Sequence, residues 1–232
     1  MGRILGALCL VLACAALTAA PATAAPTTAT AIAVTIIDDL SPRVAGQASD
    51  FSATLLDDQG HPVAGQTLSL WTQPAGSSTF DQAAQATTDG LGHVTVWTTL
   101  ERSALLEWRY DGDGASGSYA ASTPVDFAVG ISPLVTARAH HRTLRAGHRL
   151  VVTGQTFPAK AGCRVSLWNG VPRPLSAGPA PKLLARSVAR ADGSYRLVRR
   201  LHKPGRMRVA VTVASCAGNA RGFSHGIAIR VR

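Results

Sequence analysis

An internal repeat constrains the fold of this chain more than any other feature of its sequence. Three short strings recur in the same order about 100 residues further on: residues 44–47 match 145–148, residues 65–71 match 162–168, and residues 88–90 match 191–193. Between these anchors, apolar and polar residues alternate with a period of two, and Gly, Pro and Asp-Gly separate the alternating segments. This pattern is typical of short β-strands joined by tight turns. The repeat therefore predicts two all-β units of about 100 residues each.

The alternating segments give the expected strands. They are residues 51–55, 67–71, 93–98, 105–110 and 124–129 in the first half, and 150–153, 164–168, 183–188, 195–201, 207–213 and 226–231 in the second. The only weak helical candidate is residues 103–107. Units of this size with roughly seven strands favour two tandem immunoglobulin-like β-sandwiches. We expect the first over residues 33–130 and the second over residues 131–232.

The N-terminus reads as an export signal. Residues 1–24 combine a basic Arg3, a short apolar run and a small-residue cleavage site that ends at Ala24. A Pro/Ala/Thr-rich spacer is expected over residues 25–32, and no transmembrane segment in the mature chain. Lipid attachment at Cys14 is the alternative to free secretion. Either way, we expect a secreted or cell-envelope protein.

Cleavage of the signal would leave two of the four cysteines, Cys163 and Cys216. In an oxidising compartment a disulfide between them is the default expectation. Closing a loop of this length would stabilise the second unit by about 4 kcal/mol in the chain-entropy model.

The net charge of +10 conceals two opposite halves. Residues 25–130 carry three arginines against 12 acids, and residues 131–232 carry 19 Lys and Arg against one acid, Asp192. Six basic residues crowd one expected hairpin and form the candidate anion-binding site: Arg196, Arg199, Arg200, Lys203, Arg206 and Arg208. Guanidinium groups suit phosphate and carboxylate polymers. A solvated face, or docking onto the acidic half of the chain, is the competing interpretation.

The turn motifs resemble those of bacterial immunoglobulin-like domains from cell-surface and secreted proteins. In the first unit these are D-x-x-G-x-P-V-x-G at 57–65, T-D-x-x-G at 88–92 and Y-x-G-D at 110–113. The second unit resembles modules of actinobacterial secreted proteins, by R-A-G at 145–147 and A-D-G-S-Y at 191–195. The resemblance implies surface display, adhesion or spacing without catalysis, and it transfers no catalytic residue.

Other candidate sites are weaker. G-x-S-x-G at 222–226 matches a nucleophile elbow, but neither an acid nor a histidine follows within the chain. Asp111 and Asp113 lack the other ligands of an EF-hand loop. Among four tryptophans that could stack on sugars, we expect Trp97 and Trp108 to be packed, while Trp71 and Trp168 lie on the outward parity of their strands.

These features predict a non-enzymatic adhesion or interaction module without metal or cofactor. Its basic unit would bind anionic cell-wall polymers or glycans, and not cytosolic nucleic acid. Two alternatives stay open: a structural spacer that self-associates through its opposite charges, and a small-ligand carrier with the same fold.

Overall fold

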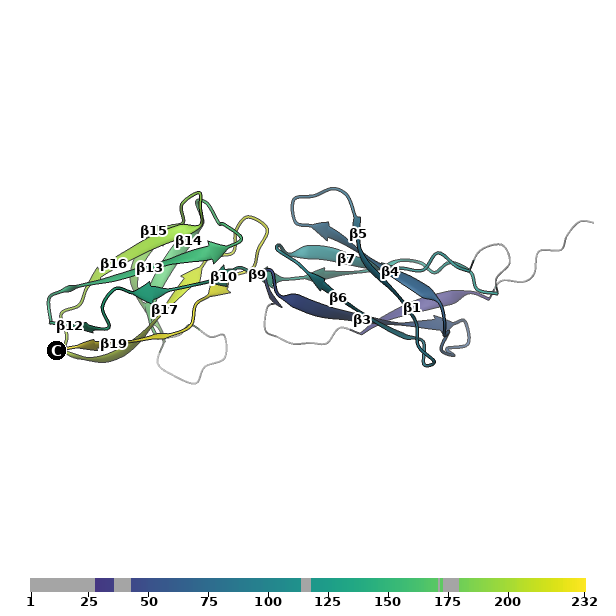
Figure 1. Ribbon diagram of the computed structural model, residues 1–232, viewed down its shortest axis with the longest axis horizontal. Helices are drawn as coiled ribbons and strands as arrows, with labels where there is room; N and C mark the ends of the chain where they lie inside the picture. The colour runs from purple at the N-terminus through teal and green to yellow at the C-terminus, as the bar shows by residue number, and fades with distance from the viewer. Residues whose placement is uncertain (1–27, 36–42, 114–117, 171, 173–179) are drawn as a thin grey trace, which may run out of the picture.

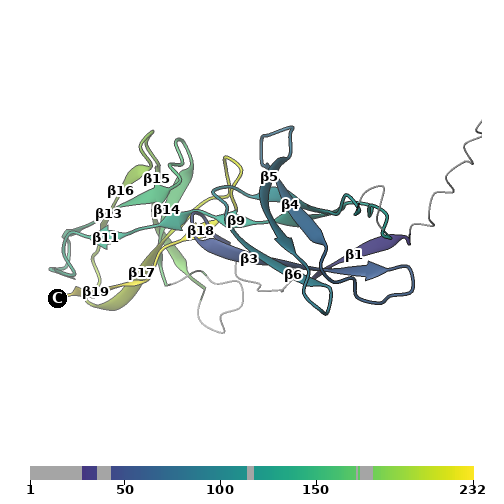
Figure 2. The ribbon, with the colours of Figure 1, turned by 45° about the vertical axis from the view of Figure 1, so that its right-hand side comes forward.

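The computed structural model describes residues 28–35, 43–113, 118–170, 172 and 180–232. The expected signal sequence, Cys14 and residues 25–27 of the expected spacer lie outside these ranges. The described residues form β-structure throughout, arranged as two units that lie end to end along the long axis (Figures 1 and 2). No helix in this described part is long and apolar enough to cross a membrane.

The first unit packs two sheets face to face. One has the order β1-β3-β6, and the other β5-β4-β7-β8, while β2 and β9 pair in parallel as a separate two-stranded sheet. The strands are β1 (Thr30–Thr35), β2 (Arg43–Val44), β3 (Ala48–Asp57), β4 (Thr67–Pro74), β5 (Asp81–Thr87), β6 (His93–Thr99), β7 (Ala104–Arg109), β8 (Val125–Val129) and β9 (Ile131–Ser132).

The second unit repeats this arrangement. Strand β13 pairs with β10, β11 and β16 in one sheet, and the other sheet has the order β12-β19-β17-β14-β15, with β18 added to β17. The strands are β10 (Leu134–Val135), β11 (Arg138–Ala139), β12 (Thr143–Leu144), β13 (Arg149–Phe157), β14 (Arg164–Asn169), β15 (Lys182–Val188), β16 (Ser194–Arg200), β17 (Gly205–Val213), β18 (Gly222–Phe223) and β19 (Ile227–Val231).

The two units share one topology. In each unit the first long strand, β3 or β13, lies in one sheet and the next long strand, β4 or β14, lies in the opposite sheet. A short strand near the start of each unit also pairs in parallel with a strand at its end, as β2 with β9 and β12 with β19. This strand order is that of an immunoglobulin-like sandwich. The structure therefore confirms the expected all-β, immunoglobulin-like fold class.

Alternation along the strands builds two separate hydrophobic cores. Leu68 and Leu70 of β4 point into the first core, and their counterparts Val165 and Leu167 of β14 point into the second. All four side chains are fully buried, as their parity predicts. Burial of apolar area on this inner face is the main stabilising contribution in each unit.

The structure corrects two boundary expectations and one helical expectation. Strand β1 begins at Thr30 and buries Ile32, so the expected spacer over residues 25–32 overlaps the first sandwich. Ile131 is 1% exposed and packs in the first core, one residue beyond the expected division at residue 130. The helical candidate at residues 103–107 lies on strand β7 from Ala104 onward, where every second side chain is buried.

The segments expected as strands are all strands. The sequence missed β5, an edge strand whose D-Q-A-A-Q-A-T sequence has small side chains and no alternating large apolar residues. It also missed the two-residue strands, which are too short to carry a period.

Candidate functional site

The cationic side chains of the second unit have no carboxylate partners among the described residues. The two contacts found there between a basic side chain and a carboxylate, His61 with Asp57 and Arg109 with Glu107, both lie in the first unit. The second unit holds a single acid, Asp192, whose carboxylate accepts a hydrogen bond from the backbone N–H of Ser194 at 2.9 Å. Most of the +18 charge of this half is therefore exposed and available to an external anion.

The structure divides the six predicted anion-binding residues between two sheets. Arg196, Arg199 and Arg200 lie on β16, which pairs with β13, whereas Arg206 and Arg208 lie on β17, which pairs with β14 and β19. Lys203 lies in the connection between them. The expected single hairpin is wrong, because consecutive strands change sheet at this point of the sandwich. All six side chains are exposed.

The first basic surface is the outer face of the β11-β13-β16 sheet. Arg138, Thr153 and Arg196 form one cross-strand row, since Thr153 is the partner of both arginines. Arg149 and Arg200 are direct partners at the other end of the same strands. Like charges placed directly opposite one another destabilise a sheet, and a bound anion removes that repulsion.

The second basic surface is the outer face of the other sheet. Arg206 and Arg230 are direct cross-strand partners there, and the side chain of Arg208 lies across Gly226, the residue just before β19. Both outer faces thus carry a pair of opposed arginines.

A cleft of about 210 Å³ opens on this second face, over β14, β15, β17 and the start of β18. It is lined by three arginines, two hydroxyl side chains and a tryptophan, with Pro172 and Ala214: Arg164, Arg186, Arg221, Ser166, Thr212 and Trp168. Its arginines are exposed, while Ser166 and Thr212 are each 7% exposed.

Strand register explains how these side chains meet. Ser166 is the cross-strand partner of both Arg186 and Thr212, so the three lie side by side on the outer face. The indole N–H of Trp168 donates a hydrogen bond to the Thr212 hydroxyl at 2.9 Å. This bond holds the ring of the half-buried Trp168 at the wall of the cleft.

The tryptophans follow the predictions with one exception. Trp108 is fully buried, and Trp71 and Trp168 lie half-buried on the outward parity of their strands, as expected. Trp97, expected to be packed, is 67% exposed on the edge strand β6. The signal for this was present in the sequence, because the buried Val94 and Val96 put Trp97 on the outward parity.

The nucleophile-elbow string belongs to a structural turn. The Ser224 hydroxyl accepts a hydrogen bond from the N–H of Val211 at 2.9 Å and donates one to the carbonyl oxygen of His225 at 3.1 Å. Ser224 is 7% exposed, and the two hydrogen bonds of its hydroxyl group, one accepted and one donated, hold the chain beside β17. Similarly, the carboxylate of Asp113 accepts the backbone N–H groups of Ser118 and Tyr119.

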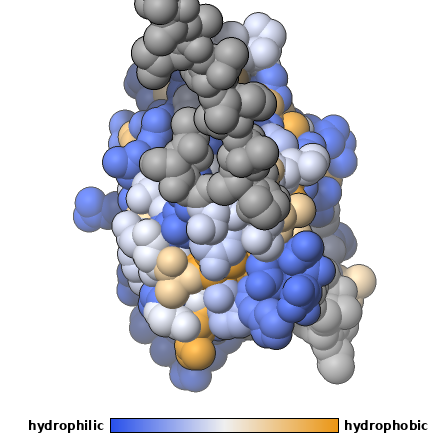
Figure 3. Space-filling view, turned by 90° about the vertical axis from the view of Figure 1, so that its right-hand side faces the viewer, coloured by the Kyte–Doolittle hydropathy of each residue, from blue (hydrophilic) through white to orange (hydrophobic). Residues whose placement is uncertain are grey.

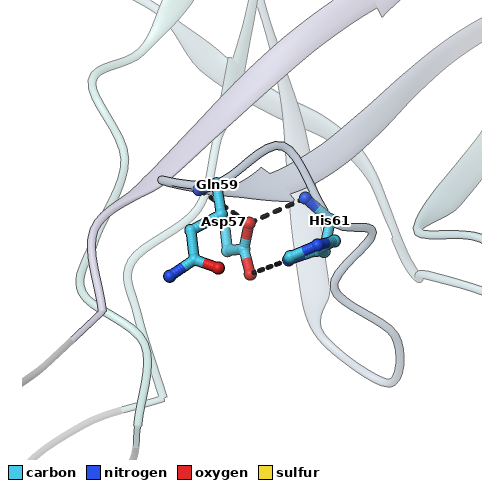
Figure 4. Close-up of polar contacts among 3 residues, drawn as sticks. All are labelled: Asp57, Gln59 and His61. Carbon is cyan, nitrogen blue, oxygen red and sulfur yellow. Dashed lines mark hydrogen bonds and ion pairs between the residues drawn. The ribbon is translucent and has the colours of Figure 1, made fainter.

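Aspartate carboxylates also stabilise turns by accepting hydrogen bonds from backbone N–H groups. The Asp57 carboxylate accepts the backbone N–H groups of Gln59 at 2.9 Å and His61 at 2.7 Å, and contacts the His61 ring at 3.2 Å (Figure 4). Burial raises the pKa of Asp57, but these bonds to His61 and Gln59 outweigh it and hold the pKa below its usual value. The same amide bonding lowers the pKa of Asp89 and Asp192 in the repeated T/A-D-G turns.

These histidines and carboxylates do not converge on a common point. Within the described residues, no group of three His, Cys, Asp or Glu side chains is placed to hold a metal ion. Figure 3 shows the end of the first unit that faces away from the second, and its described surface is mainly hydrophilic with small apolar areas. The chemically distinctive surfaces are therefore the two arginine-bearing faces of the second unit.

The expected disulfide between Cys163 and Cys216 is present, across a sequence separation of 53 residues. It ties the residue just before β14 to a tight turn, Cys216–Asn219, whose end residues form hydrogen bonds with each other through their backbones. The turn projects from the second unit and meets the first, since Gly218 accepts a hydrogen bond from the N–H of Ser103 at 2.8 Å. The disulfide thus supports the joint between the two units.

Asn219 and Lys160 complete this joint. The Asn219 side-chain amide donates to the carbonyl oxygens of Glu101 and Ile131, at 2.9 and 3.1 Å, and its oxygen accepts a hydrogen bond from the Lys160 ammonium group. Lys160 is 2% exposed and also donates to the carbonyl oxygen of Ala217. Burial lowers its pKa, because the charged form loses hydration. Sequence reasoning missed this cluster, since its members are far apart in the chain.

The solved structures that this chain resembles are remote. The D0-D1 domain of intimin is 14% identical with a TM-score of 0.30, over 86% of this chain and 97% of that one. The Yersinia pseudotuberculosis adhesin InvE is 16% identical with a TM-score of 0.33, over 88% of this chain and 58% of that one. Salmonella alpha-2-macroglobulin reacted with methylamine is 13% identical with a TM-score of 0.40, over 89% of this chain and 16% of that one.

The chain therefore spans under two thirds of InvE and a small part of alpha-2-macroglobulin. At these identities and scores the likeness gives neither a ligand nor an activity for this chain. No protein-family model matches the sequence, and no curated protein matches it.

Proposed function

We propose that this chain is a non-enzymatic interaction module of the cell surface or extracellular space, whose second unit binds anionic envelope polymers through exposed arginines. The observation that carries the proposal is the excess of 19 Lys and Arg over one acid in residues 131–232, with both outer faces bearing opposed arginine pairs. A protein that needed only a stable fold would gain by separating these pairs.

The arrangement favours polymers over single small anions. Basic groups are distributed over two faces and the β16–β17 connection, so one chain of repeated phosphates or carboxylates can engage several of them in turn. Arginine suits this role because its planar fork forms bidentate bonds with either group. Adhesion to such a polymer requires neither a nucleophile nor a metal.

Binding of the whole chain to immobilised polyglycerol phosphate tests the proposal, with neutral dextran as the matched surface. We expect saturable binding to the phosphate polymer and none to dextran. A variant with Arg138, Arg149, Arg196 and Arg200 changed to Gln should bind more weakly, since it removes four exposed charges from one face. Equal binding to the neutral and anionic surfaces would overturn the proposal.

Self-association is the second candidate, and the opposite charges of the halves favour it: three arginines against 12 acids in residues 25–130, and the reverse excess beyond them. The acidic unit of one molecule would then dock on the basic unit of another. Light scattering at low and high salt separates the two functions. Particle mass that rises at low salt without any added polymer supports association, whereas a constant monomer mass excludes it.

A further inference from the structure

The cleft over β14, β15 and β17 combines features that a general electrostatic surface does not need. It is lined by three exposed arginines, Arg164, Arg186 and Arg221, together with two nearly buried hydroxyl side chains and one half-buried tryptophan. Its volume of about 210 Å³ lies below the range of sites for drug-sized ligands, about 300–1,000 Å³. One small, polar ring fits that space.

The two halves of the cleft have different chemistry. The exposed guanidinium groups can clamp a carboxylate or phosphate with charge-assisted, bidentate hydrogen bonds. Ser166 and Thr212 present hydroxyl groups at the floor, and Trp168 presents an amphipathic ring whose orientation is fixed by its bond to Thr212. Hydroxyls and an aromatic ring match the hydroxyl edges and the C–H face of a sugar.

Neighbouring apolar side chains extend this surface. Phe223 is the cross-strand partner of Thr212 and is 36% exposed, and Val188 is the partner of Arg164 and is 59% exposed. Both therefore lie on the outward parity beside the cleft. Exposed apolar groups next to arginines favour a ligand with both apolar and anionic parts over a bare polyanion.

We infer that this cleft binds one acidic sugar residue, with a carboxylate or phosphate held by Arg164, Arg186 and Arg221 and the ring placed against Trp168. The inference rests on the proposed function and assigns it a specific site. The remaining basic residues then add affinity for the polymer without distinguishing one acidic sugar from another.

The probes distinguish recognition of the anionic group from recognition of the sugar ring. We would titrate the whole chain with trigalacturonic acid, with its methyl ester, with mannose 6-phosphate and with inorganic polyphosphate, following tryptophan fluorescence and the heat of binding. We expect trigalacturonic acid or mannose 6-phosphate to bind and the uncharged ester not to bind. Which acid binds more tightly distinguishes a carboxylate site from a phosphate site.

Exposed arginines can be changed to Gln with the fold intact, which far-UV circular dichroism checks. R164Q and R186Q should each weaken acidic-sugar binding about tenfold or more, because one hydrogen bond between charged groups contributes at least that factor. The matched control is R138Q/R196Q on the opposite sheet, which should leave sugar binding unchanged. W168F should weaken sugar binding and leave polyphosphate binding unaltered.

The outcomes are distinct for the two proposals. If the wild-type chain binds polyglycerol phosphate but R164Q, R186Q and R138Q/R196Q all bind the acidic sugars alike, the cleft is not the site and the general function stands. If no acidic sugar binds at all while the polymer does, the inference also fails alone. If neither the polymer nor the sugars bind, both proposals fail.

Discussion

Replacing Asn219 by Ala should strongly destabilise the joint between the two units. The change removes two hydrogen bonds to the carbonyl oxygens of Glu101 and Ile131, each contributing about 1 kcal/mol. It also removes the amide oxygen that accepts from the Lys160 ammonium group, a bond to a charged group that contributes about 2 kcal/mol. We therefore expect a loss of about 4 kcal/mol in the free energy of unfolding.

A double-mutant cycle with Lys160 identifies the source of this loss. In N219A the carbonyl oxygen of Ala217, at 3.2 Å, is the one hydrogen-bond acceptor that the described residues leave to the buried Lys160 ammonium group. A large part of the lost free energy of unfolding therefore comes from an incompletely paired buried charge. K160M removes that charge and fills the space with an apolar chain of similar length. K160M should therefore destabilise less than N219A, and the double variant should lose about 2 kcal/mol less than the sum of the single variants.

Urea unfolding of the oxidised chain, followed by tryptophan fluorescence, measures each step of the cycle. The buried Trp108 reports on the first unit and Trp168 on the second. If the joint couples the units, N219A should also cause the first and second units to unfold in separate transitions. A loss below about 1 kcal/mol for N219A, or strict additivity with K160M, would refute this account of the joint.

Three further predictions concern the backbone and the alkaline limit of stability. Ala217 has a φ of 47°, a left-handed conformation that favours glycine, so A217G should stabilise the chain by about 1 kcal/mol in urea unfolding; a loss would contradict this. Gly193 has a φ of +80°, and an added Cβ would lie 2.7 Å from the carbonyl oxygen of Thr156. G193A should therefore lower the free energy of unfolding by about 3 kcal/mol, and an unchanged urea midpoint would contradict this. Burial, with Asp113 and Tyr119 nearby, raises the pKa of Tyr110 to about 12. The contribution of this pKa shift to the free energy of unfolding should be complete below pH 10 and lost as the pH rises from 10 to about 12. Y110F should lack this loss when its unfolding is measured across the same range.

The fold was largely predictable because its information is local. Period-two alternation marks the long strands, and Asp-Gly turns separate them, so the strands over β3, β4, β13 and β14 follow from neighbouring residues alone. Strand β1 was hidden because its T-A-I-A-V-T sequence continues an Ala/Thr-rich stretch. Only its pairing with β3 distinguishes it from a spacer.

The candidate site was less predictable because it depends on sheet assignment. Arg196 and Arg206 are close in sequence, and a hairpin would have put them together. The sandwich instead places β16 and β17 in different sheets, which separates them. Conversely, Arg221 lines the same cleft as Arg164 because β18 pairs with the end of β17, and no local sequence pattern indicates this pairing.

The affinity of the whole chain for polyglycerol phosphate, measured against NaCl concentration, tests the central claim most directly. If several exposed arginines bind the polymer together, each releases condensed counterions, and the logarithm of the affinity falls linearly with the logarithm of the salt concentration. We predict a decrease of at least about tenfold between 50 and 200 mM NaCl, which corresponds to two or more phosphate contacts. An affinity that stays constant over this range would contradict binding by the arginine-bearing faces of the second unit.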